Sequence, residues 1–176
     1  MEAGSKGSAW NKSGSTWEEK PVNAWAYETL TESFGQLAFD APTAKLPKPP
    51  EDYGGGEVQV SCKCEKVVSV KGDVTYVVSR GKQRVVLELT FTIRFELEVR
   101  VDGELKQIVP GKLTATELAN DDLDDDTMPD CIKVQCDSSA AKWKSFFEKA
   151  VTHGGWKPVK AAINGLIDGA KQRFAP

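Results

Sequence analysis

The chain has 176 residues, with 23 Lys and Arg against 26 Asp and Glu, which gives a net charge of −3. This length suits a single domain with its own core, and the contents of hydrophobic (40%) and charged (28%) residues are typical of a globular protein. The slightly acidic balance argues against a general nucleic-acid binder, and no apolar run is long enough to predict a membrane-spanning helix. No apolar signal segment follows Met1, so we expect a cytoplasmic protein with reduced cysteines.

The N-terminal third contains one predicted helix between two irregular segments. Residues 1–16 are polar and rich in Ser and Gly, and we expect them to be disordered. Residues 21–39 carry apolar side chains at helical spacing, with Asn23 as the expected N-cap. Residues 40–56 hold four prolines and three consecutive glycines, which predicts a long surface loop. The part before this loop is too small to fold alone, so residues 17–176 are expected to form one domain.

A period of two replaces the helical spacing from residue 57 onward. Residues 57–65 alternate apolar and polar side chains, as a strand does. Gly72 and Asp73 predict a hairpin turn before a second strand at residues 74–78. The segment 79–82 predicts another turn.

The third predicted strand is the clearest element. In residues 85–101 every odd-numbered side chain is apolar and nearly every even-numbered one is polar, which indicates an antiparallel sheet with one buried face. At about 3.3 Å per residue the run spans roughly 50 Å, so we expect it to curve or to contain a bulge. Asp102 and Gly103 predict the next turn, a fourth strand follows at residues 112–117, and a short alternating stretch covers 132–136.

The C-terminal part is predicted to be helical. One helix is expected to end at Gly154 and Gly155, with Pro158 in the first turn of a second, longer helix whose apolar residues form a single stripe. The fold class expected from all these elements is α+β. It consists of an N-terminal helix, a four-stranded curved antiparallel β-meander and a long C-terminal helix packed on the sheet.

The residues that could carry metal or catalytic chemistry form no recognisable site. Neither cysteine pair has the Cys-x-x-Cys spacing of common zinc sites, so we expect metal-free thiols, with a four-thiolate zinc site as the alternative. The cysteines are Cys62, Cys64, Cys131 and Cys136. The acidic run 121–126 lacks the glycine and glutamate of an EF-hand and predicts a solvated loop. His153, the only histidine, has no nucleophile motif beside it and suits the C-terminus of a helix.

Charged residues near the predicted turns are the best candidates for function. Exposed cations on a rigid turn can steer and orient a protein partner, although turns also favour Gly and Asp for structural reasons. The candidates are Asp73, Arg80, Lys82 and Arg84. Three glutamates of the long strand share their face with Arg94 and Arg100, which favours cross-strand ion pairs over a pair of catalytic carboxylates. These glutamates are Glu88, Glu96 and Glu98.

Several motifs together resemble the N-terminal domain of the Hsp90 ATPase activators, over most of the chain. Residues 17–20, Trp-Glu-Glu-Lys, are similar to the family's entry motif, and residues 25–26, Trp-Ala, to a pair in its first helix. Asp73 precedes Lys82 by the family's spacing between its Gly-Asp turn and the last lysine of its Arg-Lys-x-Lys motif. Residues 86–89, Val-Leu-Glu-Leu, enter the long strand as in the family.

Two positions depart from the family pattern. Ser79 stands where the family has the first basic residue of its motif, and Arg84 supplies a positive charge nearby. The asparagine-rich motif that precedes the family's tryptophan is reduced here to Asn11 and Trp17 at its two ends.

The resemblance implies a co-chaperone that acts in protein folding and the stress response. It would bind the middle segment of Hsp90 and stimulate the Hsp90 ATPase by favouring the active position of the loop that carries Hsp90's catalytic arginine. The chain itself would not be an enzyme. The resemblance implies a cytoplasmic monomer with no cofactor, metal, nucleic acid or membrane partner. The implied partner-binding residues are Asp73, Arg80, Lys82, Arg84, Asn11 and Trp17.

Two questions stay open at this stage. Longer relatives have a second domain that engages the Hsp90 N-domains, and the sequence does not decide whether this chain is a stand-alone short form or part of a longer protein. The alternative function is a helix-grip domain, in which the apolar face of residues 87–101 lines a cavity for a small hydrophobic ligand or a lipid.

Overall fold

The computed structural model describes residues 17–41, 56–137 and 141–175. The predicted disorder of residues 1–16, including the candidate Asn11, lies outside the described residues, as does most of the predicted loop at 40–56. No helix in the described part of the chain combines the length and apolar character that crossing a bilayer requires.

The described residues form an α+β fold, as predicted, with one antiparallel sheet. The strands run in the order β1-β3-β4-β5-β6, and β2 also pairs with β3. The described sheet has six strands rather than the predicted four. Two of the predicted strands are a single strand, β3, and three short strands, β1, β2 and β6, are added to the sheet. The elements are β1 (Trp17–Pro21), α1 (Asn23–Gly35), β2 (Ala38–Asp40), β3 (Val58–Ser79), β4 (Lys82–Val101), β5 (Glu104–Ala119), the 3-10 helix η3 (Asn120–Asp124), β6 (Ile132–Cys136) and α2 (Ala141–Arg173).

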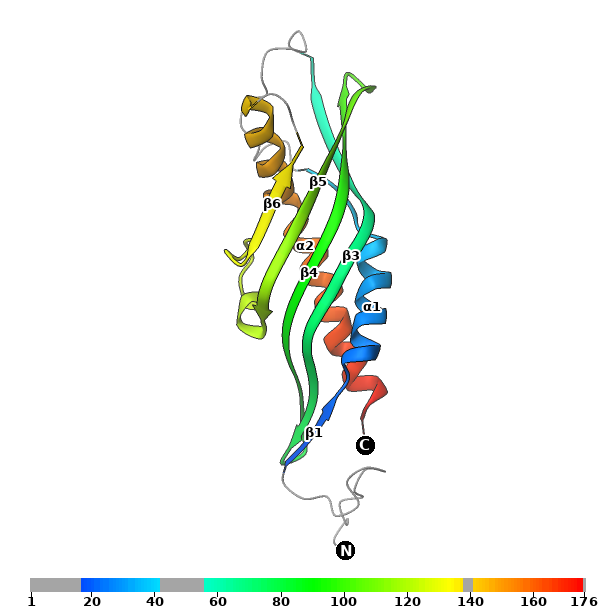
Figure 1. Ribbon diagram of the computed structural model, residues 1–176, viewed down its shortest axis with the longest axis vertical. Helices are drawn as coiled ribbons and strands as arrows, with labels where there is room; N and C mark the ends of the chain where they lie inside the picture. Colours follow the sequence, from blue (N-terminus) through cyan, green and yellow to red (C-terminus); the bar gives the residue numbers. More distant parts are fainter. Residues whose placement is uncertain (1–16, 42–55, 138–140, 176) are drawn as a thin grey trace, which may run out of the picture.

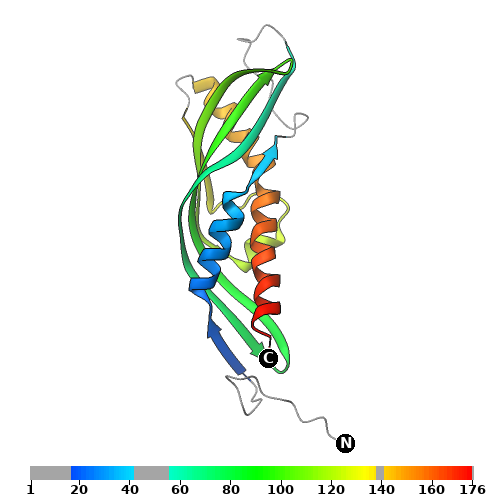
Figure 2. The same cartoon turned by 90° about the vertical axis from the view of Figure 1, so that its right-hand side faces the viewer.

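Both helices cover the same face of the curved sheet (Figures 1 and 2). The odd-numbered side chains of β4, from Val85 to Val101, are all buried against this face, as the alternation predicts. Their polar neighbours point to the opposite face, which no helix covers in either view. Near the C-terminal end of α2, Phe174 packs against the core, with its ring 5.3 Å from that of Trp25 and 6.2 Å from that of Tyr76. The sheet therefore presents one buried and one open face.

The predicted turn at Gly72 and Asp73 is wrong, because both residues lie inside β3. Gly72 pairs with Leu89 and Asp73 with Glu88, so the two predicted strands form one strand of 22 residues. Gly72 has a φ of 117°, and a Cβ placed on it would lie 2.0 Å from the carbonyl oxygen of Glu88. The glycine is therefore needed because two strands approach closely, and not because the chain reverses.

The two turns predicted next along the chain are confirmed as two-residue hairpins. Arg80 and Gly81 join β3 to β4 with φ angles of 50° and 76°. Asp102 and Gly103 join β4 to β5 with φ angles of 50° and 83°. Positive φ at both central residues is the backbone of the turn that matches the twist of an antiparallel ribbon.

The two predicted C-terminal helices are one continuous helix, α2, of 33 residues. Gly154 does not end it but packs against the ring of Phe39, where a Cβ would lie only 2.8 Å away. Pro158 lies inside the helix and removes one backbone hydrogen bond. The buried side chain of Trp156 belongs to the apolar face of the helix at this point. His153 is thus an exposed residue of the helix interior and not the predicted C-terminal residue.

Candidate partner-binding surface

Three of the candidate residues lie at the end of the sheet where β3 turns into β4, and Asp73 lies farther along β3. Asp73, Arg80, Lys82 and Arg84 are all exposed. Lys82 and Arg84 lie opposite Ser79 and Val77, and Asp73 lies opposite Glu88, so these side chains share the face that the helices leave open. We call the set Asp73, Arg80, Lys82, Arg84 and Val86 the hairpin surface.

The hairpin surface has an ordered charge pattern along the strands. Lys82 is six positions along β4 from Glu88, the residue opposite Asp73, which corresponds to about 20 Å. Its cations therefore lie at the turn and its carboxylate lies farther along the sheet. A partner that fits this surface must present acidic groups at one end and a basic group at the other.

Val86 is a member of this surface that sequence reasoning missed. It lies between the cationic and acidic ends, opposite Thr75, and its side chain is 55% exposed. The signal was present in the sequence, since Val86 is an apolar residue at a polar position of the β4 alternation. An exposed apolar side chain flanked by charges is typical of the centre of a protein interface.

Helix α1 fixes the backbone around Asp73. The side chain of Asn23 accepts a hydrogen bond from the amide of Val74 at 2.7 Å and donates one to the carboxylate of Asp73 at 3.3 Å. The Tyr27 hydroxyl donates to the carbonyl oxygen of Gly72. Val22, and not the predicted Asn23, is the N-cap residue of α1, so Asn23 is free to bind β3 instead. These contacts hold Asp73 in place although its side chain is exposed.

The two remaining candidates are Trp17 and Asn11. Trp17 begins β1, where its backbone lies opposite Ser79 beside the β3–β4 turn. Its position therefore brings it to the same end of the sheet as Arg80. Asn11 lies outside the described residues.

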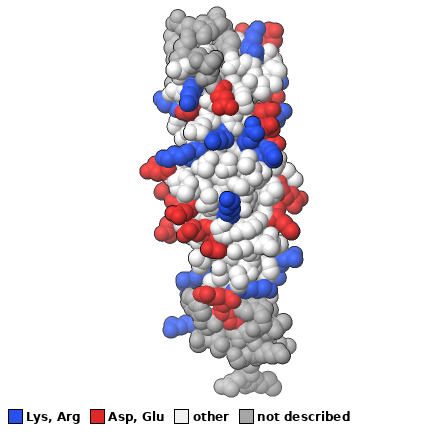
Figure 3. All heavy atoms as spheres, viewed as in Figure 1, with Lys and Arg blue, Asp and Glu red and all other residues white. Residues whose placement is uncertain are grey.

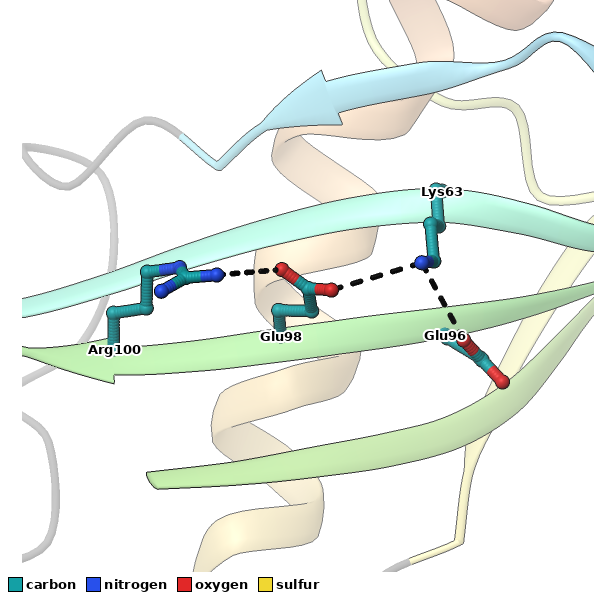
Figure 4. A network of polar contacts seen from close by, with 4 residues as sticks. All are labelled: Lys63, Glu96, Glu98 and Arg100. Atoms are coloured by element: carbon teal, nitrogen blue, oxygen red, sulfur yellow. Dashed lines mark hydrogen bonds and ion pairs between the residues drawn. The ribbon is translucent and has the colours of Figure 1, made fainter. Parts of the chain in front are cut away.

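Two of the three glutamates in the prediction, Glu96 and Glu98, are ion-paired farther along the open face (Figure 4), and Glu88 has no ion pair among the described residues. Lys63 lies 3.6 Å from Glu98 and 3.9 Å from Glu96, and Arg100 lies 3.3 Å from Glu98. Lys63 comes from β3 and the glutamates from β4, so its two pairs cross strands, whereas Arg100 and Glu98 both belong to β4. This network engages the carboxylates that a catalytic pair would need.

Two cysteines lie in the core, and all four are free thiols. Burial raises the pKa of Cys62 to about 12, and the neighbouring Cys136 and Cys64 add to the effect. Burial, followed by the carboxylates of Glu148 and Asp137, likewise raises the pKa of the Cys136 thiol to about 12. Both groups therefore stay protonated, unreactive thiols at neutral pH.

We expect iodoacetamide at pH 8 to leave Cys62 and Cys136 unmodified in the folded protein and to modify them fully after unfolding. The pKa of an unfolded thiol is near 9, and the pKa of each of the two folded thiols is about 12. The contribution of these thiols to the free energy of unfolding is therefore fully present below pH 9 and is lost as the pH rises toward 12. Peptide mass spectrometry and urea unfolding at pH 8 and 10.5 measure the two effects. Native alkylation of Cys62 at the rate of a free thiol, or the added mass of a zinc ion, would contradict the assignment.

The acidic run forms η3 and an exposed loop that is attached to α2. Asp122 accepts a hydrogen bond from the amide of Ala119 at 2.8 Å. The carbonyl oxygen of Asp125 accepts hydrogen bonds from Trp156 at 2.9 Å and from Lys160 at 3.0 Å. Among the described residues, no three His, Cys, Asp or Glu side chains are arranged to hold a metal ion.

The space between the sheet and α2 does not resemble a ligand pocket. The cavity that Cys64, Phe95 and Val159 help to line measures about 20 Å³, which is room for about one water molecule. Pockets for small ligands usually measure about 300–1,000 Å³. The apolar face of β4 forms a packed core, which gives the ligand-binding alternative no support.

The fold and the surface together define a class of protein: an α+β module with a helix-covered sheet, whose candidate chemistry lies on an open face rather than in a cavity. The family described as Activator of Hsp90 ATPase, N-terminal, matches residues 19–170, and the chain belongs to this family.

A solved structure is also similar to this chain. It is the crystal structure of Aha-1 from Plasmodium falciparum, which has a TM-score of 0.51 and 13% sequence identity. The match covers 90% of this chain and 95% of the other. At this identity the likeness concerns the fold. A search of curated proteins gave no match.

Proposed function

We propose that this chain binds the middle segment of Hsp90 through the hairpin surface and stimulates the Hsp90 ATPase. The observation that carries the proposal is membership of the Hsp90 ATPase activator family over residues 19–170. Binding would favour the active position of the loop that carries Hsp90's catalytic arginine. Such activation requires only that the chain bind one conformer of Hsp90 more tightly than the other.

The hairpin surface supports this proposal by its physical properties. Its charged groups are exposed, and the short turn and the contacts of α1 hold the backbone beneath them. These residues therefore lose little conformational freedom when a partner binds, and a small loss of conformational entropy favours affinity. Val86 supplies an apolar contact between the charged ends. In this proposal the chain is a cytoplasmic monomer that regulates its partner and carries out no catalysis of its own.

We expect the chain alone to hydrolyse no ATP and to raise the steady-state ATPase rate of an Hsp90 weakly but saturably. The measurement is ATP turnover at increasing concentrations of the chain, with a specific Hsp90 inhibitor as the blank. Unchanged turnover together with no binding in calorimetry would overturn the proposal. Binding to an isolated middle segment, compared with an isolated N-domain, tests which part of Hsp90 is the partner.

A further inference from the structure

A row of three cations crosses the open face of the sheet, away from the hairpin surface. Lys66 of β3 lies opposite Arg94 of β4, and Arg94 lies opposite Lys112 of β5. Arg94 is eight positions along β4 from Val86, which corresponds to about 27 Å. Figure 3 shows Lys and Arg gathered in a band across the upper half of this face. We call Lys66, Arg94 and Lys112 the cation row.

The cation row is unfavourable for folding. Like charges directly opposite each other on neighbouring strands destabilise a sheet, and here three stand in sequence. Arg94 has a partner in Glu65 at 3.7 Å, but both side chains are largely exposed, so the pair contributes little. Neither Lys66 nor Lys112 has an ion-pair partner among the described residues. The row therefore leaves positive charge available to a ligand.

The cation row lies in a depression of the surface. Shifts of register between Cys64 and Lys66 and between Val67 and Ser69 leave Glu65 and Val68 as extra residues in β3. Such bulges redirect side chains and bend the sheet. The depression measures about 470 Å³, and the cation row shares its lining with Val68, Pro110 and Gln135. Val68 is 50% exposed and offers an apolar contact beside the charges.

We propose that the cation row binds an acidic, extended segment of a partner protein. Neighbouring strands lie about 4.8 Å apart, so the row spans about 10 Å. In an extended peptide, carboxylates two positions apart lie about 7 Å from each other on the same side, a spacing that long lysine side chains can meet. Asp137 lines the depression and Glu65 lies 3.7 Å from Arg94, and these two carboxylates disfavour a continuous polyphosphate chain. The site is independent of the proposed contact with Hsp90.

The test uses a fluorescein-labelled peptide of eight glutamates and fluorescence polarisation at 50 and 200 mM NaCl. We expect the wild type to bind the peptide and the double variant Lys66→Gln, Lys112→Gln to bind it at least tenfold more weakly. The Tm of this variant should be unchanged or higher, because a like-charge row has been relieved. The control is Lys149→Gln, Lys157→Gln, which makes the same change of charge at exposed positions of α2 and should keep the affinity within twofold.

Three results would overturn the proposal: no binding of the peptide by the wild type, an equal loss of affinity in both double variants, or tighter binding of a single-stranded DNA 16-mer. The variant Asp73→Lys separates the two surfaces. It is expected to lose Hsp90 and to keep the glutamate peptide, so the two proposals can fail separately.

Discussion

We expect Asp73→Lys to weaken Hsp90 binding by at least about 2 kcal/mol, or roughly 30-fold, without lowering the Tm. If Asp73 faces a cation of the partner, the substitution replaces an attraction with a like-charge contact, which typically costs several kcal/mol. Folding should tolerate it, because Asp73 is exposed and lies opposite Glu88, so the new ammonium group faces a carboxylate. The folded protein gives up one long, exposed hydrogen bond from Asn23.

Calorimetric titration with Hsp90, with the Tm recorded for each variant, measures this effect. Asp168→Lys is the control, since it makes the same charge change at an exposed position of α2 and should keep wild-type affinity. Arg80→Ala and Lys82→Ala should each cost about 1–3 kcal/mol if they lie at the centre of the interface. If Asp73→Lys melts normally and still binds as tightly as the wild type, the docking face lies elsewhere.

Gly72→Ala is expected to cost about 3 kcal/mol or more of unfolding free energy. The added Cβ would meet the carbonyl oxygen of Glu88 at 2.0 Å and the Cα of Leu89 at 3.0 Å, and both are backbone atoms that cannot turn aside. The φ of 117° adds strain for any residue with a side chain. Strands β3 and β4 must separate at this point, which also disturbs the carbonyl that accepts from Tyr27.

Gly165→Ala is the matched control for the same change of residue type. Gly165 lies inside α2, and a Cβ there would meet no atom within 4 Å. Alanine should stabilise the protein by about 0.5–1 kcal/mol, because glycine is a poor helix former. Urea unfolding of both variants gives the comparison. A Gly72→Ala protein within about 0.5 kcal/mol of the wild type would show that the strands do not approach as closely as described.

Periodicity predicted the parts of the fold that are regular over many residues. The alternation of β4 and the apolar spacing of α1 and α2 follow from burying one face of an element, and that signal is local. Gly72, Gly154 and Gly155 misled the prediction because glycine serves both turns and close packing. Only the neighbouring residues, Glu88 and Phe39, show which of the two applies. Such neighbours are distant in sequence, so local patterns do not reveal them.

Those parts of the candidate surface that depend on local sequence signals could be predicted, and the other parts could not. Arg80 and Lys82 could be found because a two-residue turn has a strong local signature, and the turn makes them exposed. Asp73 was selected for a turn that does not exist, although it is indeed exposed. The cation row could not be predicted, because it depends on the register of three strands and on two bulges in β3.

The long pairing of β3 with β4 has a consequence for how the chain folds. The two strands are joined by two residues and pair from Ser79 and Lys82 to Val58 and Val101, with two bulges in β3, so each pair of residues brings the next into reach. Closing such a short loop loses little chain entropy, and hairpin formation is fast, typically about 1–10 μs. The strand β1 pairs with residues 75–79 of β3, the part of the ribbon next to the turn. The turn that displays Arg80 is therefore the natural starting point for the central ribbon, and a residue there that resists positive φ would delay folding of the whole sheet.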